Sequence, residues 1–185
     1  VIRNFQPKNN FLEKVRDICN KKNIILIFDE CTTGFRQTFG GIHKHYGVNP
    51  DMAIFGKALG NGYAINAIIG KEKIMRNAEK TFISSTFWTE KTGYVAALKT
   101  LEEMEKIKSW KQITAKGYQI RKKWARLANK YNLKIDFMGI PAISSFYIKS
   151  KNFIKYKTLI TQELLKDSIL ASNVIYFSTK HNQAM

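Results

Sequence analysis

A carboxylate and an amine that could act together in one reaction each follow a short apolar run of the sequence. Residues 24–30 read IILIFDE, so Asp29 and Glu30 end an unbroken apolar run, and Lys57 comes just after the run at 52–55. In open parallel sheets, functional side chains gather outside the carboxyl ends of the strands. If the two runs form neighbouring strands, a carboxylate and an amine face one cleft. The alternative is a salt bridge that only closes two strand ends.

The residues around Lys57 do not match the common phosphate-binding motifs. In FGKALGNGYAINAIIGK, residues 55–71, the Gly-Lys pair precedes the glycine turn, which is the reverse of a P-loop. No third glycine falls three residues after Gly62, as a dinucleotide fingerprint requires. A lysine at the edge of an apolar segment therefore needs another explanation.

The first hundred residues alternate between helical and strand patterns, which is typical of the α/β class. Residues 9–23 carry one apolar helical stripe, made of Phe11, Val15, Ile18 and Cys19, with Asn10 as the candidate cap. The run at 24–30 predicts a strand buried on both faces, as in a parallel sheet, and 52–55 and 65–70 predict two more short buried strands.

The pattern changes in the second half of the chain. It predicts helices over 89–107 and 113–131, strands over 133–139 and 143–149, a helix over 156–172 and a last strand over 173–178. We predict a boundary near residue 108, which divides the chain into 1–108 and an α+β layer at 109–185. The sequence begins just ahead of a helix and stops without a final element, so we expect both ends to be cut.

Composition excludes several classes of function. The net charge is +17, but the basic residues are spread along the chain and lysine outnumbers arginine 25 to 6, which argues against a nucleic-acid partner. No run approaches the length of a membrane span, and two cysteines indicate a reducing, cytoplasmic compartment. His43 and His45 lack a third ligand nearby, so no metal site is predicted.

Three stretches in the same order resemble the class III aminotransferases, pyridoxal-phosphate enzymes of fold type I that include glutamate-1-semialdehyde aminomutase. The stretches are LIFDECTTGFR, YGVNPDMAIFGKALGNGYAINAIIGK and STFWTEKTGYVAALKTLE, and the separation 57 − 29 = 28 is also the family's. The resemblance implies that 1–108 is the C-terminal part of the cofactor-binding large domain, with a mostly parallel sheet and flanking helices. It implies that 109–185 is part of the α+β small domain.

The resemblance also implies a role for five residues. Lys57 matches the lysine that forms a Schiff base with pyridoxal 5'-phosphate, and Asp29 matches the aspartate that pairs with the pyridine nitrogen. Cys31 stands where the family more often has a valine that packs on the ring. Thr86 matches a residue that binds the cofactor phosphate across a dimer interface, and Ser85 beside it is a further donor.

Two departures from the family limit what the resemblance implies. Thr32 stands where many ω-amino-acid aminotransferases have a glutamine that bonds the ring hydroxyl, which is closer to the aminomutase side of the family. The family's N-terminal half, with its phosphate loop and stacking aromatic, has no counterpart in this sequence.

The implied function is amino-group transfer on a small amine or amino acid, by a homodimer in the full-length form. The alternative is a truncated, non-catalytic remnant. The sequence leaves open which molecules donate and accept the amino group, and whether the enzyme is a transferase or a mutase.

Overall fold

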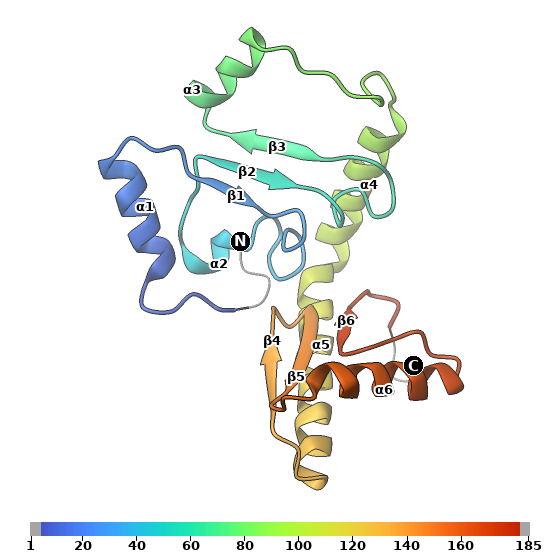
Figure 1. The fold of residues 1–185 in the computed structure, drawn as a ribbon. Helices are drawn as coiled ribbons and strands as arrows, with labels where there is room; N and C mark the ends of the chain where they lie inside the picture. The colour runs from blue at the N-terminus through green and yellow to red at the C-terminus, as the bar shows by residue number, and fades with distance from the viewer. Residues whose placement is uncertain (1–4, 182–185) are drawn as a thin grey trace. The chain divides into compact units, whose positions relative to one another are not determined.

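The computed structural model describes residues 5–181, which fall into two compact units (Figure 1). One unit is Pro7–Trp110, and the other consists chiefly of the residues from Lys111 onward. Both units mix helices with a three-stranded sheet, so the chain is of the α/β kind that the sequence predicts.

The first unit contains the sheet β1-β2-β3, made of β1 (Ile27–Asp29), β2 (Met52–Phe55) and β3 (Ala67–Gly70). β1 and β2 are parallel, whereas β3 runs antiparallel to β2. The first pair is parallel as expected, and the second is antiparallel, a direction that the sequence did not predict. The segment that joins β2 to β3 is too short for the crossover that a parallel partner needs, so the chain turns back on itself.

The expected burial of these strands is also wrong in part. β1 is shorter than the run at 24–30, and Ile24, Ile25 and Ile27 are exposed, as is most of β3. Within residues 5–181, β1 and β3 are the edges of the sheet, and only β2 has a strand on both sides. An apolar run therefore produced an edge strand whose outer residues have little cover.

Among the described residues of the first unit, five short or medium helical segments accompany this sheet. They are α1 (Phe11–Lys21), α2 (His43–Tyr46), α3 (Glu72–Met75), the 3-10 helix η1 (Arg76–Lys80) and α4 (Thr92–Ile107). The helix forms as predicted, but only Cys19 of the predicted apolar stripe is buried, whereas Phe11 and Ile18 are exposed. The other buried residue of α1 is Leu12, which lies outside that stripe. Asn10 stands at the predicted capping position, but it has φ 54° and its side chain makes no capping hydrogen bond.

The core of the first unit forms where α4 covers the sheet. Ala53 and Phe55 of β2 pack with Leu59 and with Ala97 of α4. Gly93 of α4 permits this approach, because a Cβ there would lie 2.9 Å from the Ala64 carbonyl oxygen. The helix therefore holds both β2 and the segment that follows Lys57.

A buried carboxylate ties the other end of β2 to its neighbours. Asp51 accepts hydrogen bonds from the Arg16 guanidinium of α1, at 2.8 Å, and from the Leu26 N–H ahead of β1, also at 2.8 Å. Its second oxygen accepts from Lys71 Nζ at 2.6 Å, just after β3. One side chain thus fixes α1 and all three strands at the edge of the sheet away from Lys57.

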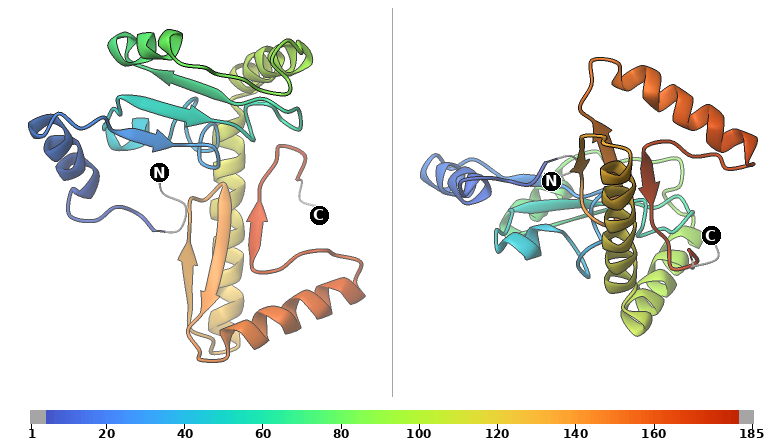
Figure 2. Two further views of the ribbon diagram at one scale, coloured as in Figure 1. Left: turned by 45° about the horizontal axis from the view of Figure 1, so that its top comes forward. Right: turned by 90° about the horizontal axis from the view of Figure 1, so that it is seen from below.

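The second unit pairs a long helix with an antiparallel sheet. Its elements are α5 (Ser109–Lys130), β4 (Ile135–Met138), β5 (Ile143–Ile148), α6 (Phe153–Lys166) and β6 (Val174–Tyr176), and the sheet order is β4-β5-β6 (Figure 2). All the predicted elements are present, although α6 begins and ends earlier than the predicted 156–172.

The contact between α5 and its sheet is close. A Cβ at Gly117 would lie 1.9 Å from the Pro141 carbonyl oxygen, so only glycine fits there. Arg121 donates to the Met138 and Gly139 carbonyl oxygens at 2.9 Å each, and Trp124 packs edge-on against Phe146.

Among residues 5–181, no helix is both long enough and apolar enough to cross a bilayer.

Candidate functional site

Asp29 and Lys57 lie at the same edge of the first sheet. Asp29 is the last residue of β1 and pairs in register with Ile54 of β2, and Lys57 follows the end of β2 by two residues. The predicted pairing of neighbouring strands is confirmed, because β1 and β2 are adjacent and parallel. Their carboxyl ends therefore meet at one edge.

Asp29 is held in its charged form. The Cys31 N–H donates to Asp29 Oδ1 at 2.9 Å. This bond, with smaller contributions from the Cys31 thiol and the Lys57 charge, lowers the pKa of the Asp29 carboxyl below its ordinary value. The carboxylate is negative throughout the neutral range and can pair with a positive group.

Cys31 stands beside this carboxylate as a neutral group. Partial burial raises the pKa of the Cys31 thiol, and the hydrogen bond to Asp29 raises it further. A protonated thiol is a poor nucleophile and packs like a small apolar side chain. Its chemistry is therefore that of a contact surface beside Asp29.

Lys57 leaves the strand in an unusual backbone conformation. Its φ is +44°, in the left-handed region that residues with a side chain seldom adopt. Gly56 before it allows the turn, because a Cβ there would lie 2.2 Å from Asn66 Oδ1. The exposed side chain donates from Nζ to Thr32 Oγ1 at 2.5 Å.

Glu30 builds the turn that carries Cys31 and Thr32. It is fully buried, and its carboxylate accepts from the Ile42 N–H at 2.7 Å, the His43 N–H at 3.0 Å and the Thr33 hydroxyl at 3.0 Å. His43 Nδ1 lies 2.8 Å from the same carboxylate. Glu30 thus has a structural role, and it faces away from the chemistry that its neighbour Asp29 offers.

Ser85 and Thr86 lie elsewhere in the first unit. They belong to the exposed segment between η1 and α4, which runs beyond β3, whereas Asp29 ends β1 on the opposite side of the sheet (Figure 1). Ser85 Oγ accepts from the Phe87 N–H at 3.3 Å, a local contact. The chain therefore gathers Asp29, Cys31 and Lys57, and leaves Ser85 and Thr86 apart.

The contact of Thr32 with the lysine was not predicted from the sequence, where Thr32 stood out only as a departure from a glutamine. The signal was available in part, since Thr32 follows Asp29 by three residues in a turn at the sheet edge that also receives Lys57.

Comparison with known protein families identifies the family to which this chain belongs. The family model for class III aminotransferases matches residues 4–170. The chain belongs to the class III aminotransferase family. That match includes every residue of the site described above, and it confirms the resemblance found in the sequence.

Two curated members of the family show how much of a relative the chain spans. It is 40% identical over 157 residues to a 3-aminobutyryl-CoA aminotransferase of Cloacimonas acidaminovorans, covering 84% of this chain and 38% of the relative. It is 32% identical over 154 residues to a glutamate-1-semialdehyde 2,1-aminomutase of Methanococcus maripaludis, covering 82% and 36%. The chain thus spans less than two fifths of these class III relatives.

Solved structures of transaminases share the fold. The FumI protein of Sphingopyxis sp. MTA144, solved in a form carrying PLP, matches with a TM-score of 0.90 at 20% identity, over 100% of this chain and 46% of that one. An omega-transaminase from Sphaerobacter thermophilus matches with a TM-score of 0.85 at 20% identity, over 97% and 45%. Both units therefore follow the fold of fold-type I transaminases.

Proposed function

We propose that the chain supplies the lysine-bearing part of a pyridoxal-phosphate-dependent amino-group transferase, with Lys57 as the residue that holds the cofactor. One observation carries the proposal: the parallel pairing of β1 and β2 brings the Asp29 carboxylate and the Lys57 amine to one sheet edge in a class III chain. We further propose that residues 1–108 belong to the large domain and 109–185 to the small domain.

The residues present fit this cofactor. Asp29, whose pKa is lowered, can accept a hydrogen bond from a protonated pyridine nitrogen and keep it protonated. Cys31, with its raised pKa, offers a neutral surface beside that carboxylate for one face of the ring. When bound, pyridoxal phosphate supplies an electron-accepting ring that stabilises negative charge on the carbon bearing the amino group. Lys57, as the free amine, would move the proton at that carbon.

Ser85 and Thr86 fit a role toward a second copy of the chain. Their segment is exposed and stands beyond β3, apart from the Lys57 edge. We propose that this segment reaches the cofactor phosphate of a partner subunit, which makes the active form a homodimer. Hydroxyl and backbone N–H groups are suitable donors to a phosphate.

The substrate is proposed to be a small amine or amino acid. The two relatives above are named for a transferase on 3-aminobutyryl-CoA and for a mutase on glutamate 1-semialdehyde, and the first is the more similar to this chain. We therefore favour intermolecular transfer. Both described cysteines are free, which supports the predicted reducing, cytoplasmic compartment.

A second candidate is cofactor binding without turnover, the remnant that the sequence left open. It is supported by the span of the chain, which is 38% of the length of the aminotransferase relative.

Reductive labelling tests the role of Lys57. The protein is incubated with pyridoxal phosphate, reduced with borohydride and mapped by peptide mass spectrometry. We expect the pyridoxyl mass chiefly at Lys57, saturating at low cofactor concentration, although the chain has 25 lysines. Lys57→Arg removes the saturable signal, and Lys122→Arg, at an exposed position on α5, leaves it unchanged. Labelling spread over exposed lysines without preference for Lys57 contradicts the proposal.

A further inference from the structure

The contact between Thr32 and Lys57 joins two residues that are 25 positions apart. Lys57 Nζ donates to Thr32 Oγ1 at 2.5 Å, and the lysine side chain is otherwise exposed. A lysine has a flexible stem with many rotamers, so a single well-placed acceptor selects one of them. The Thr32 hydroxyl therefore decides where the amine rests.

The turn that carries Thr32 is itself held in place. The Arg36 Nε–H donates to the Thr32 carbonyl oxygen at 2.9 Å, and the Gly34 N–H donates to the Glu30 carbonyl oxygen at 2.8 Å. Glu30 is in turn fixed by the donors of its buried carboxylate. A hydroxyl on such a turn can orient a flexible partner, because the turn does not move with it.

The backbone of Lys57 is fixed from its own side. Lys57 has a left-handed φ and follows Gly56, a position with no room for a side chain. The Asn61 N–H also donates to the Lys57 carbonyl oxygen at 3.0 Å. The lysine is thus anchored at its Cα by the turn after β2 and at its Nζ by Thr32. The stem between these two points is the part left to reorient.

We propose that Thr32 is a positioning residue that presents the Lys57 amine at the sheet edge beside Asp29, ready to meet the cofactor aldehyde. This deepens the proposed function and rests on the role of Lys57 in it. The hydroxyl would accept from the amine before the cofactor binds. The amine would leave the hydroxyl when its nitrogen bonds to the aldehyde carbon, giving up its two protons as the aldehyde oxygen departs as water. Orientation of a nucleophile raises the rate of its reaction without changing what it reacts with.

The test measures how fast borohydride-trapped pyridoxyl accumulates at Lys57. Thr32→Val keeps the shape and removes the hydroxyl, and we expect the rate at Lys57 to fall by roughly two- to tenfold, the range of one hydrogen bond. Thr32→Ser, which keeps the hydroxyl, should label close to the wild-type rate. Thr32→Ala removes the hydroxyl without bulk and should match Thr32→Val, which guards against a variant that packs badly.

A matched control separates orientation from loosening of the loop. Thr38 lies in the same loop, and its hydroxyl bonds the Gly41 carbonyl oxygen at 2.7 Å. Thr38→Val should leave the labelling rate at Lys57 unchanged, and labelling at Lys122 should be the same in every variant. An equal loss in Thr38→Val and Thr32→Val overturns the proposal, as does a wild-type rate in Thr32→Val.

The two proposals fail in different ways. If the wild-type protein shows no preferential labelling of Lys57, the proposed function itself is wrong. If Lys57 is labelled preferentially and at the same rate with and without the Thr32 hydroxyl, the proposed function stands and only the positioning role is lost.

Discussion

Lys71 Nζ lies 2.6 Å from Asp51 Oδ1, so the residue after β3 is bound to the residue before β2. Burial alone would raise the pKa of the Asp51 carboxyl. The Leu26 N–H, Lys71 and Arg16 outweigh it and hold that pKa well below the ordinary value. The charged form of Asp51 is therefore part of what keeps the sheet together, even though it lies away from the chemistry.

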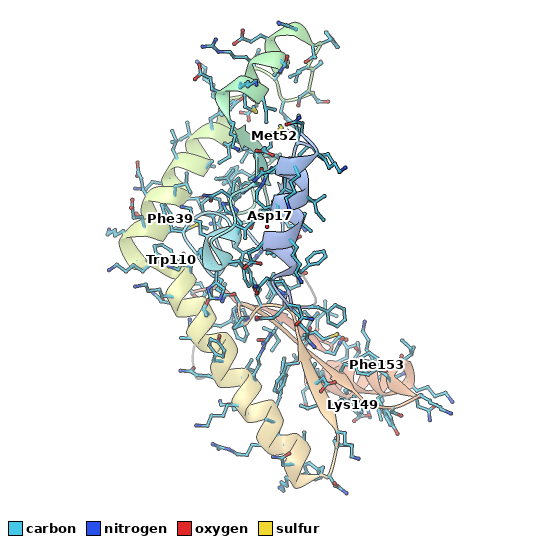
Figure 3. All side chains as sticks on the ribbon, turned by 90° about the vertical axis from the view of Figure 1, so that its left-hand side faces the viewer. Asp17, Phe39, Met52, Trp110, Lys149 and Phe153 are labelled. Atoms are coloured by element: carbon cyan, nitrogen blue, oxygen red, sulfur yellow. The ribbon has the colours of Figure 1, made fainter. Side chains whose placement is uncertain are left out.

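We predict that Asp51→Asn destabilises the protein by about 2 kcal/mol, since a buried carboxylate loses its charged hydrogen bonds. The variant Asp17→Asn, at an exposed position on α1 (Figure 3), should change stability little and serves as the control. Urea unfolding followed by circular dichroism measures both. A loss for Asp51→Asn no larger than that for Asp17→Asn would show that the network adds nothing.

The lowered pKa of Asp51 predicts how the free energy of unfolding responds to acid. A carboxyl with a depressed pKa in the folded state contributes stability that is complete above its unfolded pKa of about 4. This contribution is lost as the pH falls through the lower pKa of the folded state. We expect the wild-type free energy of unfolding to drop below pH 4 more steeply than that of Asp51→Asn. Parallel curves for the two proteins between pH 5 and 2, by urea titration, would contradict this.

Asp29→Asn should weaken retention of pyridoxal phosphate. The substitution removes the negative charge that a protonated pyridine nitrogen requires, and we expect the affinity to fall by about tenfold or more, the scale of one charged hydrogen bond. Half-saturation of labelling at Lys57 measures it, with Asp17→Asn again as the control. Equal half-saturation in Asp29→Asn and wild type would remove Asp29 from the cofactor site.

Glu30→Gln should be strongly destabilising although it lies next to Asp29. The amide replaces one acceptor oxygen with a donor that faces the N–H group of either Ile42 or His43, so we expect a loss of about 3 kcal/mol. Glu102→Gln removes an exposed charge paired with Lys99 and should cost less than about 1 kcal/mol. Thermal melting compares the two, and similar melting temperatures would refute the anchoring role of Glu30.

Gly56→Ala should disturb the turn that delivers Lys57. A Cβ there would approach Asn66 Oδ1 to 2.2 Å, and we expect a stability loss of about 1–3 kcal/mol together with slower labelling at Lys57. In the double variant Gly56→Ala/Asn66→Ala the obstruction is removed, so part of the labelling rate should return. Strict additivity of the two substitutions would show that they do not interact.

The sequence predicted most of the elements and the strand pairing that brings Asp29 and Lys57 to one edge, for identifiable reasons. The helices α1, α4 and α5 and the strands on either side of Pro141 could be predicted because each pattern is local. The pairing of β1 with β2 followed from two apolar runs that both end at polar groups. These are the features that a linear pattern can carry.

What could not be predicted depends on neighbours in space. The direction of β3 depends on how the chain turns after Lys57, and the exposure of Ile25 depends on what covers the edge of β1. The contact of Thr32 with Lys57 depends on a left-handed residue that no propensity favours. The course of the exposed segment that carries Ser85 and Thr86, which runs beyond β3, likewise depends on how the chain folds in space (Figure 1).

The division of the chain into two units affects the order in which its parts fold during translation. Phe39 rests against Trp110 at the end of the first unit, and every residue that we assign to the cofactor, from Asp29 to Thr86, lies before that point (Figure 3). Units of this kind tend to fold as they leave the ribosome, earlier ones first. The Lys57 edge can therefore take shape while the residues from Lys111 onward are still being translated.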